Sequence, residues 1–177
     1  MTAPTANTLF VSDGRIGIDI SNVDSACKYM PNQTHIGAQG SEWVYVLAGA
    51  ALNKGAMVAI NGSGVATGVT GAGISTASST LSQRYGFVQT AFLASQWGFV
   101  AVRGSKVVVR VQGTVSQNSP LFTTDTTGEL GASTATASQF QIFGVVLEST
   151  ASASGTSATV STANISFPVL RKPKAGS

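Results

Sequence analysis

The chain has 177 residues, of which 43% are hydrophobic and 10% are charged, with a formal net charge of +3. The hydrophobic content excludes a wholly disordered protein, and the length is sufficient for one domain with a buried core. The basic residues are scattered and do not form a dense basic face interleaved with aromatic residues, so no nucleic-acid partner is expected.

Small uncharged residues take the place of charged ones, with 22 Ser, 20 Thr and 20 Gly in the chain. A charge-poor surface tends to associate, and small side chains lose little rotamer freedom at a contact. The composition therefore predicts a protein that binds copies of itself or another protein.

The single cysteine, Cys27, cannot form an intramolecular disulfide, which indicates synthesis in a reducing compartment such as the cytoplasm. The start MTAPTANTLF has no basic region and no long apolar run, so no secretory signal is expected. The most apolar stretch, residues 43–60, is interrupted by Asn53, Lys54 and Gly55 too early for a membrane-spanning helix, so no membrane partner is expected.

Residues 1–41 differ from the rest of the chain. Residues 8–20 form a weak alternating pattern around a turn at Asp13 and Gly14, and residues 22–39 contain few periodic apolar residues. Because a structureless loop of this length is uncommon inside a compact domain, we expect an extended arm with one hairpin that packs on a partner. The alternative is the first hairpin of the main domain followed by a long loop. The hydrophobic candidates for partner contact are Leu9, Phe10, Val11, Ile16, Ile18 and Ile20.

Residues 42–170 carry short apolar and β-branched runs separated by turn residues. The expected strands cover residues 42–47, 57–60, 65–70, 85–92, 97–103, 106–112, 121–124, 139–148 and 159–170. No segment has the pattern and caps of an amphipathic helix. We therefore expect an all-β fold, a small antiparallel β-barrel or sandwich with an extended N-terminal arm and a basic polar tail at residues 171–177.

Residues 84–113 are expected to form the centre of the sheet. Gly104 and Ser105 lie between two β-branched runs, which is typical of a two-residue hairpin turn. In the returning strand, Val107, Val109 and Val111 share one face because side chains alternate along a strand. Further on, Pro168 indicates an edge strand or a strand end, because proline has no backbone N–H.

Three segments repeat an aromatic residue, a glycine and two apolar residues, around Gly86, Gly98 and Gly144. Glycine within a strand is typical of a bulge, a bend or a close backbone approach. The predicted core consists of large apolar residues in the strand-like segments, namely Val44, Val46, Met57, Val58, Phe87, Phe99, Val107, Val109, Val111, Ile142, Val145 and Phe167.

Residues that could carry catalysis or hold a metal are few and isolated. Asp125 and Glu129 do not match a calcium-binding loop, and turn chemistry accounts for the aspartate. His35 has no second histidine or cysteine at zinc-ligand spacing, and no nucleophile motif surrounds Cys27. Phosphate-binding loop motifs are also missing. We therefore expect a protein without enzymatic activity, cofactor or metal.

From residue 42 to residue 172 the order of phrases resembles a known family. A strand leads into ALNKGAMVAINGSGVATGVT, then RYGFVQTAFLASQWGFVAVRGSKVVVRVQG, then SPLFTTDTTGELGASTATASQFQIFGVVLEST, and finally NISFPVLRKP. This order resembles the head decoration, or cement, proteins of tailed bacteriophages. Residues 1–41 have no counterpart in the resemblance.

The resemblance implies a small β-barrel-like domain, often oligomeric, on the outer surface of a capsid. Such a protein binds the major capsid protein and reinforces the shell, and the resemblance favours a homotrimer. It implies no catalytic residues. Arg171 and Lys172 in the basic tail join the arm residues as candidate capsid contacts. The remaining alternative is a glycan-binding or host-recognition domain of a phage fibre or head appendage, which would also be all-β and catalytically silent.

Overall fold

The computed structural model describes residues 10–11, 18–37, 40–75, 83–132, 139–154 and 157–172. The described residues form strands, turns and one short helix, α1 (Gly71–Ser75), so the expected all-β class is confirmed. A separate small sheet contains β1 (Phe10–Val11) and β2 (Ile18–Asp19). The larger sheet contains β3 (Thr34–Ile36), β4 (Glu42–Ala48), β5 (Met57–Ile60), β6 (Val65–Gly68), β7 (Arg84–Val88), β8 (Trp97–Gln112), β9 (Leu121–Thr123), β10 (Leu130–Gly131), β11 (Gln141–Leu147) and β12 (Ala158–Arg171).

β8 is the strand around which the larger sheet is built. It pairs antiparallel with β4, β7 and β12, and parallel with β10. A second parallel pair joins β4 to β6. The sheet is therefore mixed, and the expectation of a purely antiparallel sheet is wrong. The reason is that β5 and β9 each lead into a hairpin whose second strand returns alongside β4 or β8 in the same direction.

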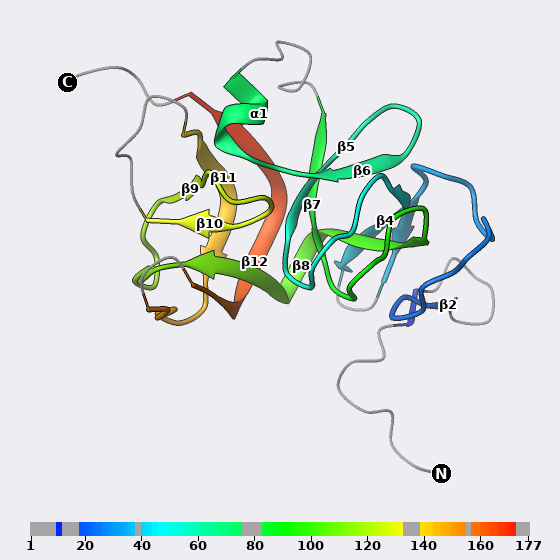
Figure 1. Ribbon diagram of the computed structural model, residues 1–177. Coiled ribbons are helices and arrows are strands. Elements are labelled where there is room, and N and C mark those ends of the chain that lie inside the picture. The colour runs from blue at the N-terminus through cyan, green and yellow to red at the C-terminus, as the bar shows by residue number, and fades with distance from the viewer. Residues whose placement is uncertain are drawn as a thin grey trace.

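Apart from β3, which pairs with β4, the larger sheet consists of two units with the same order of pairings. In the first unit, β4 pairs in turn through β6, β5 and β7 to β8, which pairs back to β4. In the second unit, β8 pairs in turn through β10, β9 and β11 to β12, which pairs back to β8. Figure 1 shows the two units side by side, with β8 running from one to the other.

The loops of the two units match as well. An isolated antiparallel bridge joins Leu52 to Phe92 in the first unit, and a corresponding bridge joins Val115 to Ala151 in the second. Each bridge consists of two reciprocal backbone hydrogen bonds of 2.9 Å. The chain therefore uses one arrangement of strands twice, and β8 is the last strand of the first unit and the first strand of the second.

Turn conformations repeat at matching places. Gly64 before β6 and Gly128 before β10 have φ angles of 78° and 75°. Gly55 and Asn118, in the loops that follow the bridging residues Leu52 and Val115, have φ angles of 80° and 61°. These left-handed conformations suit glycine and are tolerated by asparagine. The shared turn geometry supports the equivalence of the two units.

The predicted hairpin turn at Gly104 and Ser105 is wrong. β8 continues through both residues and bends there instead. Val107 pairs with Ala163 and Gly104 pairs with Ile165, so two residues of β8 lie opposite one residue of β12. This arrangement is a β-bulge, which bends a strand and increases its twist. No turn forms because β12 pairs with β8 on both sides of the bend.

A second irregularity lies between β11 and β12. The pairing shifts at Gly144, where three residues of β12 lie opposite one residue of β11. Pro168 is one of those three, so its missing N–H falls where the ladder is already interrupted. β12 therefore does not end at Pro168. The predicted edge position is wrong for the strand as a whole, because β12 lies between β11 and β8, although beyond Ser166 its pairing within the described residues is with β11 alone.

The predicted core residues are buried, with one exception. Phe167 is 48% exposed, so its assignment to the core is wrong. It lies in the bulge of β12 with a φ angle of 48°, and the extra residues there interrupt the alternation on which the prediction rested. The buried residues form two clusters. One lies inside the first unit, and the other fills the second unit and continues onto the outer face of the first.

The three repeated glycines have the roles expected of them. A Cβ on Gly86 would lie 2.7 Å from the carbonyl oxygen of Ala101 in β8, and a Cβ on Gly98 would lie 2.5 Å from the ring of Phe92. Gly144 has a φ angle of 77° at the shift between β11 and β12. Two of the glycines thus permit close approach and the third permits a bulge.

Polar groups from the first unit satisfy the edge of β8 in the second. The Arg110 amide donates a hydrogen bond of 2.8 Å to the carbonyl oxygen of Gly55. The side-chain amide of Gln89 donates to the Val108 carbonyl at 3.0 Å and accepts from the Val108 N–H at 2.9 Å. Gln89 thereby takes the place that a neighbouring strand would occupy, and it ties the two units together.

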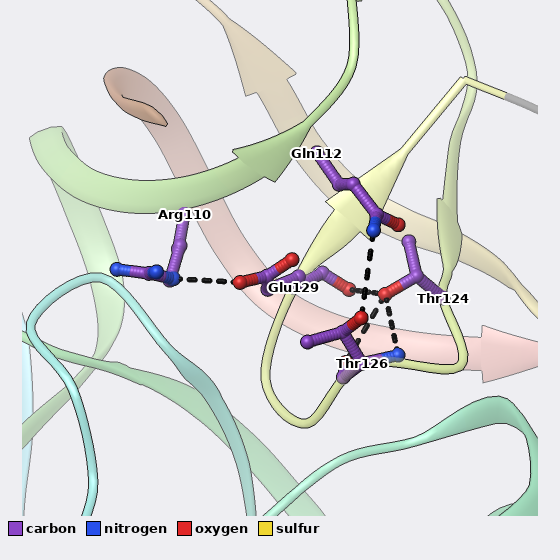
Figure 2. Close-up of polar contacts among 5 residues, drawn as sticks. All are labelled: Arg110, Gln112, Thr124, Thr126 and Glu129. Carbon is purple, nitrogen blue, oxygen red and sulfur yellow. Dashed lines mark hydrogen bonds and ion pairs between the residues drawn. The ribbon is translucent and has the colours of Figure 1, made fainter. Parts of the chain in front are cut away.

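An ion pair with a buried carboxylate and a partly exposed arginine lies in the second unit where it meets the first (Figure 2). Arg110 Nε lies 2.8 Å from Glu129 Oε1, and the Glu129 side chain is 6% exposed. The Thr124 hydroxyl donates to the Glu129 carbonyl oxygen at 3.1 Å and accepts from the Thr126 amide at 3.2 Å. Gln112 donates to the Thr126 hydroxyl at 3.4 Å. Within the described ranges, Glu129 Oε2 is buried without a hydrogen-bond partner, so Arg110 is the main compensation for this charge.

The two phenylalanines test the division between core and surface. We expect Phe99→Ala to lower the free energy of unfolding by about 3–5 kcal/mol, because it leaves a cavity among buried rings. Phe167→Ala is the matched control and should change it by about 0.5 kcal/mol or less, because the side chain is half-exposed. Urea unfolding measures both. Equal losses in the two variants would refute this assignment.

The ion pair predicts a larger loss of stability when Arg110 is replaced than when the more exposed Arg103 is replaced. Arg110→Met should lower the free energy of unfolding by about 3–5 kcal/mol, because it leaves the Glu129 carboxylate buried without a counter-charge. The control is Arg103→Met, which removes an ion pair with Glu42 at 3.1 Å whose arginine is 51% exposed. Such a pair contributes about 0–1 kcal/mol. A loss after Arg110→Met no larger than that of the control would contradict the role given to the buried pair.

Candidate interaction surface

The structure separates the residues predicted to contact a partner. Leu9 and Ile16 lie outside the described residues, whereas Phe10 and Val11 form β1 and Ile18 lies in β2. Ile20 is 3% exposed and packs in the core of its own chain. Arg171 and Lys172 are exposed at the end of β12. In Figure 1, that end of β12 lies on the opposite side of the molecule from β2, so the two groups do not form one site.

Residues 20–37, here called the strap, pack on the outer face of the first unit, and Val23 within them also packs against the internal cluster of that unit. β3 pairs with β4, and Asp24 forms a bridge with Trp97 of β8. The Tyr29 ring packs against Tyr45 with centroids 5.1 Å apart, and against Phe99 with centroids 5.5 Å apart. The predicted division of the chain at residue 41 stays a prediction, but the strap is packed on the sheet.

A buried carboxylate holds the strap in place. Asp24 is 7% exposed, forms an ion pair with Lys28, and accepts a hydrogen bond of 3.1 Å from the Tyr45 hydroxyl. The hydrogen bond to Asp24 raises the pKa of Lys28. Burial raises the pKa of Tyr45 to about 12, so its hydroxyl stays protonated and able to donate at neutral pH.

The residues considered for catalysis or metal binding form hydrogen bonds, ring contacts or ion pairs with their own chain. Cys27 is exposed, and its thiol donates to the Tyr29 carbonyl oxygen at 3.1 Å. His35 is buried against Phe99, with ring centroids 5.4 Å apart. Glu129 belongs to the ion pair with Arg110. Across the part of the chain that the structure describes, no group of three or more His, Cys, Asp or Glu side chains is placed to hold a metal.

The outer surface of β11 and β12 carries a group of exposed hydrophobic side chains. Their exposed fractions are Phe143 39%, Val146 46%, Phe167 48% and Val169 46%. Phe143 and Val169 are direct cross-strand partners, and the shift in pairing places Phe167 beside them. Exposed apolar side chains gathered on two paired strands are typical of a site that another protein covers.

Two arginines flank these hydrophobic side chains. The Arg171 guanidinium lies over the Phe143 ring at 5.1 Å, and the Arg103 guanidinium lies over the Phe167 ring at 5.8 Å. Arg103 is also paired with Glu42. We call Phe143, Val146, Phe167, Val169, Arg103 and Arg171 the Phe–Arg patch. Its apolar centre and cationic margin suit a protein surface with exposed apolar groups and acidic side chains.

Of the residues in the Phe–Arg patch, the sequence predicts only Arg171 as a partner contact. Phe167 is predicted to be buried, and Phe143 appears only as the aromatic residue of the repeat around Gly144. The signals in the sequence for a bulge were Gly144 and Pro168, because glycine and proline within strands are both typical of bulges. In the structure the two residues lie at the same irregularity between β11 and β12. A bulge changes which residues face outward.

Comparison of the sequence with protein-family models and with curated proteins gives no match. Within the described ranges, no helix has both the length and the apolar character needed to cross a membrane.

The contact between Tyr45 and Asp24 predicts a pH dependence. The pKa of tyrosine is about 10 when unfolded and about 12 for Tyr45 in the fold. The stability due to the protonated hydroxyl is therefore present below about pH 10 and is lost as the pH rises through about 12. We expect Tyr45→Phe to lower the free energy of unfolding at neutral pH by about 1–3 kcal/mol, and to weaken its fall at alkaline pH.

Chemical unfolding at neutral and alkaline pH measures this effect. Tyr85, whose pKa burial also raises, remains in the variant and accounts for any residual alkaline loss. Parallel pH profiles for the variant and the native protein would show that Tyr45 does not carry the dependence.

Proposed function

We propose that the protein is a structural virion protein that binds the outer surface of a bacteriophage capsid and cements neighbouring major capsid subunits. The observation that supports this most directly is the Phe–Arg patch, an exposed apolar surface with two guanidinium groups at its margin. The order of sequence phrases from residue 42 to residue 172, which resembles phage decoration proteins, supports the choice of partner.

The patch is suited to a rigid docking role. Its residues come from β8, β11 and β12, which are hydrogen-bonded strands and not loops. A site on paired strands keeps its geometry when it binds, so less conformational entropy is lost on association. Lys172 follows β12 directly and is an exposed, positively charged residue next to Arg171 in the sequence.

The proposal includes a finer view of the fold, in which each unit is a small barrel. Two pairings support it, because each returns a unit to its starting strand. Ala48 pairs with Ala66 in the first unit, and Val111 pairs with Leu130 in the second. A closed arrangement leaves few free strand edges, which suits a protein that functions beside many copies of itself.

The proposed protein is a homo-oligomer, with a trimer favoured, made in the host cytoplasm and located on the capsid exterior. Neither nucleic acid nor a membrane is a proposed partner, and no enzymatic activity is proposed. Binding to glycans is less well supported, since Trp43, Tyr45 and Tyr85 are buried and the exposed rings of Phe143 and Phe167 each have an arginine guanidinium over them.

The test is binding to phage particles that are encoded by the same genome as this protein but are assembled without it. We expect the native protein to bind them and to copurify with complete particles. Phe143→Ser combined with Val169→Ser should weaken binding at least about tenfold, a change of about 1.4 kcal/mol. The control is Leu93→Ser, which alters a 67% exposed residue outside the patch.

Thermal unfolding of each variant shows whether the fold is retained. Undiminished particle binding by the double variant would remove the patch from the proposal. Failure of the native protein to bind particles, together with selective binding on a glycan array, would overturn the function itself.

A further inference from the structure

On the basis of the proposed function, we infer that Arg171 is the residue of the Phe–Arg patch that selects the partner, and that it binds an aspartate or glutamate carboxylate on the major capsid subunit. Two observations lead to this assignment. One is the way in which the two units are covered, and the other is the difference between the surroundings of the two arginines.

The patch lies on a face of the second unit whose counterpart in the first unit is covered. Tyr85 of β7 and Phe143 of β11 each precede the glycine of a repeated segment, and β7 and β11 have the same place in the pairings of their units. Tyr85 is 2% exposed and belongs to the hydrophobic cluster that continues from the second unit onto the first. Phe143 is 39% exposed, since no third unit follows among the described residues. Covering this face with a partner would remove exposed apolar surface from water, which favours association.

The two arginines of the patch differ in what neutralises them. Arg103 Nη1 lies 3.1 Å from Glu42 Oε1, so its charge is compensated within the chain. Arg171 is exposed, and among the described residues it forms no ion pair. A partner that covers the patch displaces water from Arg171, and removing an unpaired charge from water is unfavourable. The covering surface therefore has to supply a negative charge at Arg171.

The Arg171 side chain is arranged to present hydrogen-bond donors to that charge. Its guanidinium lies over the Phe143 ring, 5.1 Å from the centroid. This cation–π contact holds the group in place and uses none of its N–H donors. The planar guanidinium matches the two oxygens of a carboxylate. Arg171 is thus suited to a two-point contact with a carboxylate beside the apolar side chains of the patch.

The carboxylates of this chain do not suit the same contact, which argues against a second copy as the partner. Three of them are paired with cations of their own chain, namely Asp24, Glu42 and Glu129. Of the other described carboxylates, Asp19 accepts hydrogen bonds from Ser21, and Glu148 accepts one from the Lys106 amide. Asp125 is exposed in a turn whose other residues are threonine and glycine, so it has no large apolar neighbour to cover the patch.

The first experiment measures binding to particles assembled without this protein. Arg171→Glu should weaken binding at least about tenfold, because it places a negative charge opposite the partner carboxylate. Lys172→Glu is the matched control, since it changes the net charge equally at the next exposed residue, outside the patch. It should weaken binding by less than about threefold. Arg171→Gln should also reduce the salt dependence of binding, because it removes one charge from the contact.

The second experiment identifies the partner group by exchanging two neighbouring residues. Arg171→Lys combined with Lys172→Arg keeps the charge of the native protein and moves the primary amine to position 171. A carbodiimide joins such an amine directly to a carboxylate in contact with it, with loss of water to the reagent. We expect mass spectrometry of treated particles to show an amide bond from position 171 to an aspartate or glutamate of the major capsid subunit. The native protein, with its lysine at position 172, should not form this bond.

Equal losses of binding after Arg171→Glu and Lys172→Glu would overturn the role of Arg171 and leave the proposed function in place. So would the absence of a cross-link from position 171, or a cross-link to a second copy of this chain. Failure of the native protein to bind particles would overturn the proposed function itself. Thermal unfolding shows whether each variant keeps its fold, which we expect because both side chains are exposed.

Discussion

The backbone hydrogen bonds of β8 are the interaction on which the rest of the structure depends. This strand of 16 residues pairs with β4, β7, β10 and β12, and it contributes to both hydrophobic clusters. A buried backbone group without a partner costs about 1–3 kcal/mol. Beyond the residues of β8 that pair with β7, the edge of β8 forms hydrogen bonds with the side chain of Gln89 and with the carbonyl oxygen of Gly55. The bulge after Gly104 turns the strand from one unit into the other without interrupting its pairing with β12.

Few charges lie inside the protein, because both units form their cores from apolar side chains in the same way. Each unit places alternate residues of its strands inside, so the apolar clusters form from short β-branched runs. Two carboxylates are exceptions, Asp24 in the strap, which is paired with Lys28, and Glu129 near the contact between the units, which is paired with Arg110. The Glu129 carboxylate has the fewer partners, because its second oxygen has no hydrogen-bond partner within the described residues. Burying this charge is unfavourable by itself, and the pair serves to hold the β9–β10 turn in one position against β8.

The two units differ in what covers them, and this difference directs the proposed functions. The first unit carries large aromatic residues outside, and the strap covers them through Tyr29 and the contact of Asp24 with Tyr45. The second unit has Val108, Thr162 and Val160 at the corresponding positions, and the Phe–Arg patch lies on β11 and β12 beside Arg103 of β8.

The sequence by itself determined the all-β class, the positions of most strands, and a core that is correct apart from Phe167. These properties follow from the local alternation of side chains, which needs no knowledge of pairing. It also indicated special roles for Gly86, Gly98 and Gly144. Only the tertiary structure decided that Gly104 lies in a bend and not in a turn, that the units repeat, and that Phe167 faces outward. Each of these depends on which distant strand supplies the hydrogen-bond partners. Pairing with β12 on both sides of Gly104 keeps β8 extended there. The extra residues of β12 opposite Gly144 reverse the alternation of inward-facing and outward-facing side chains.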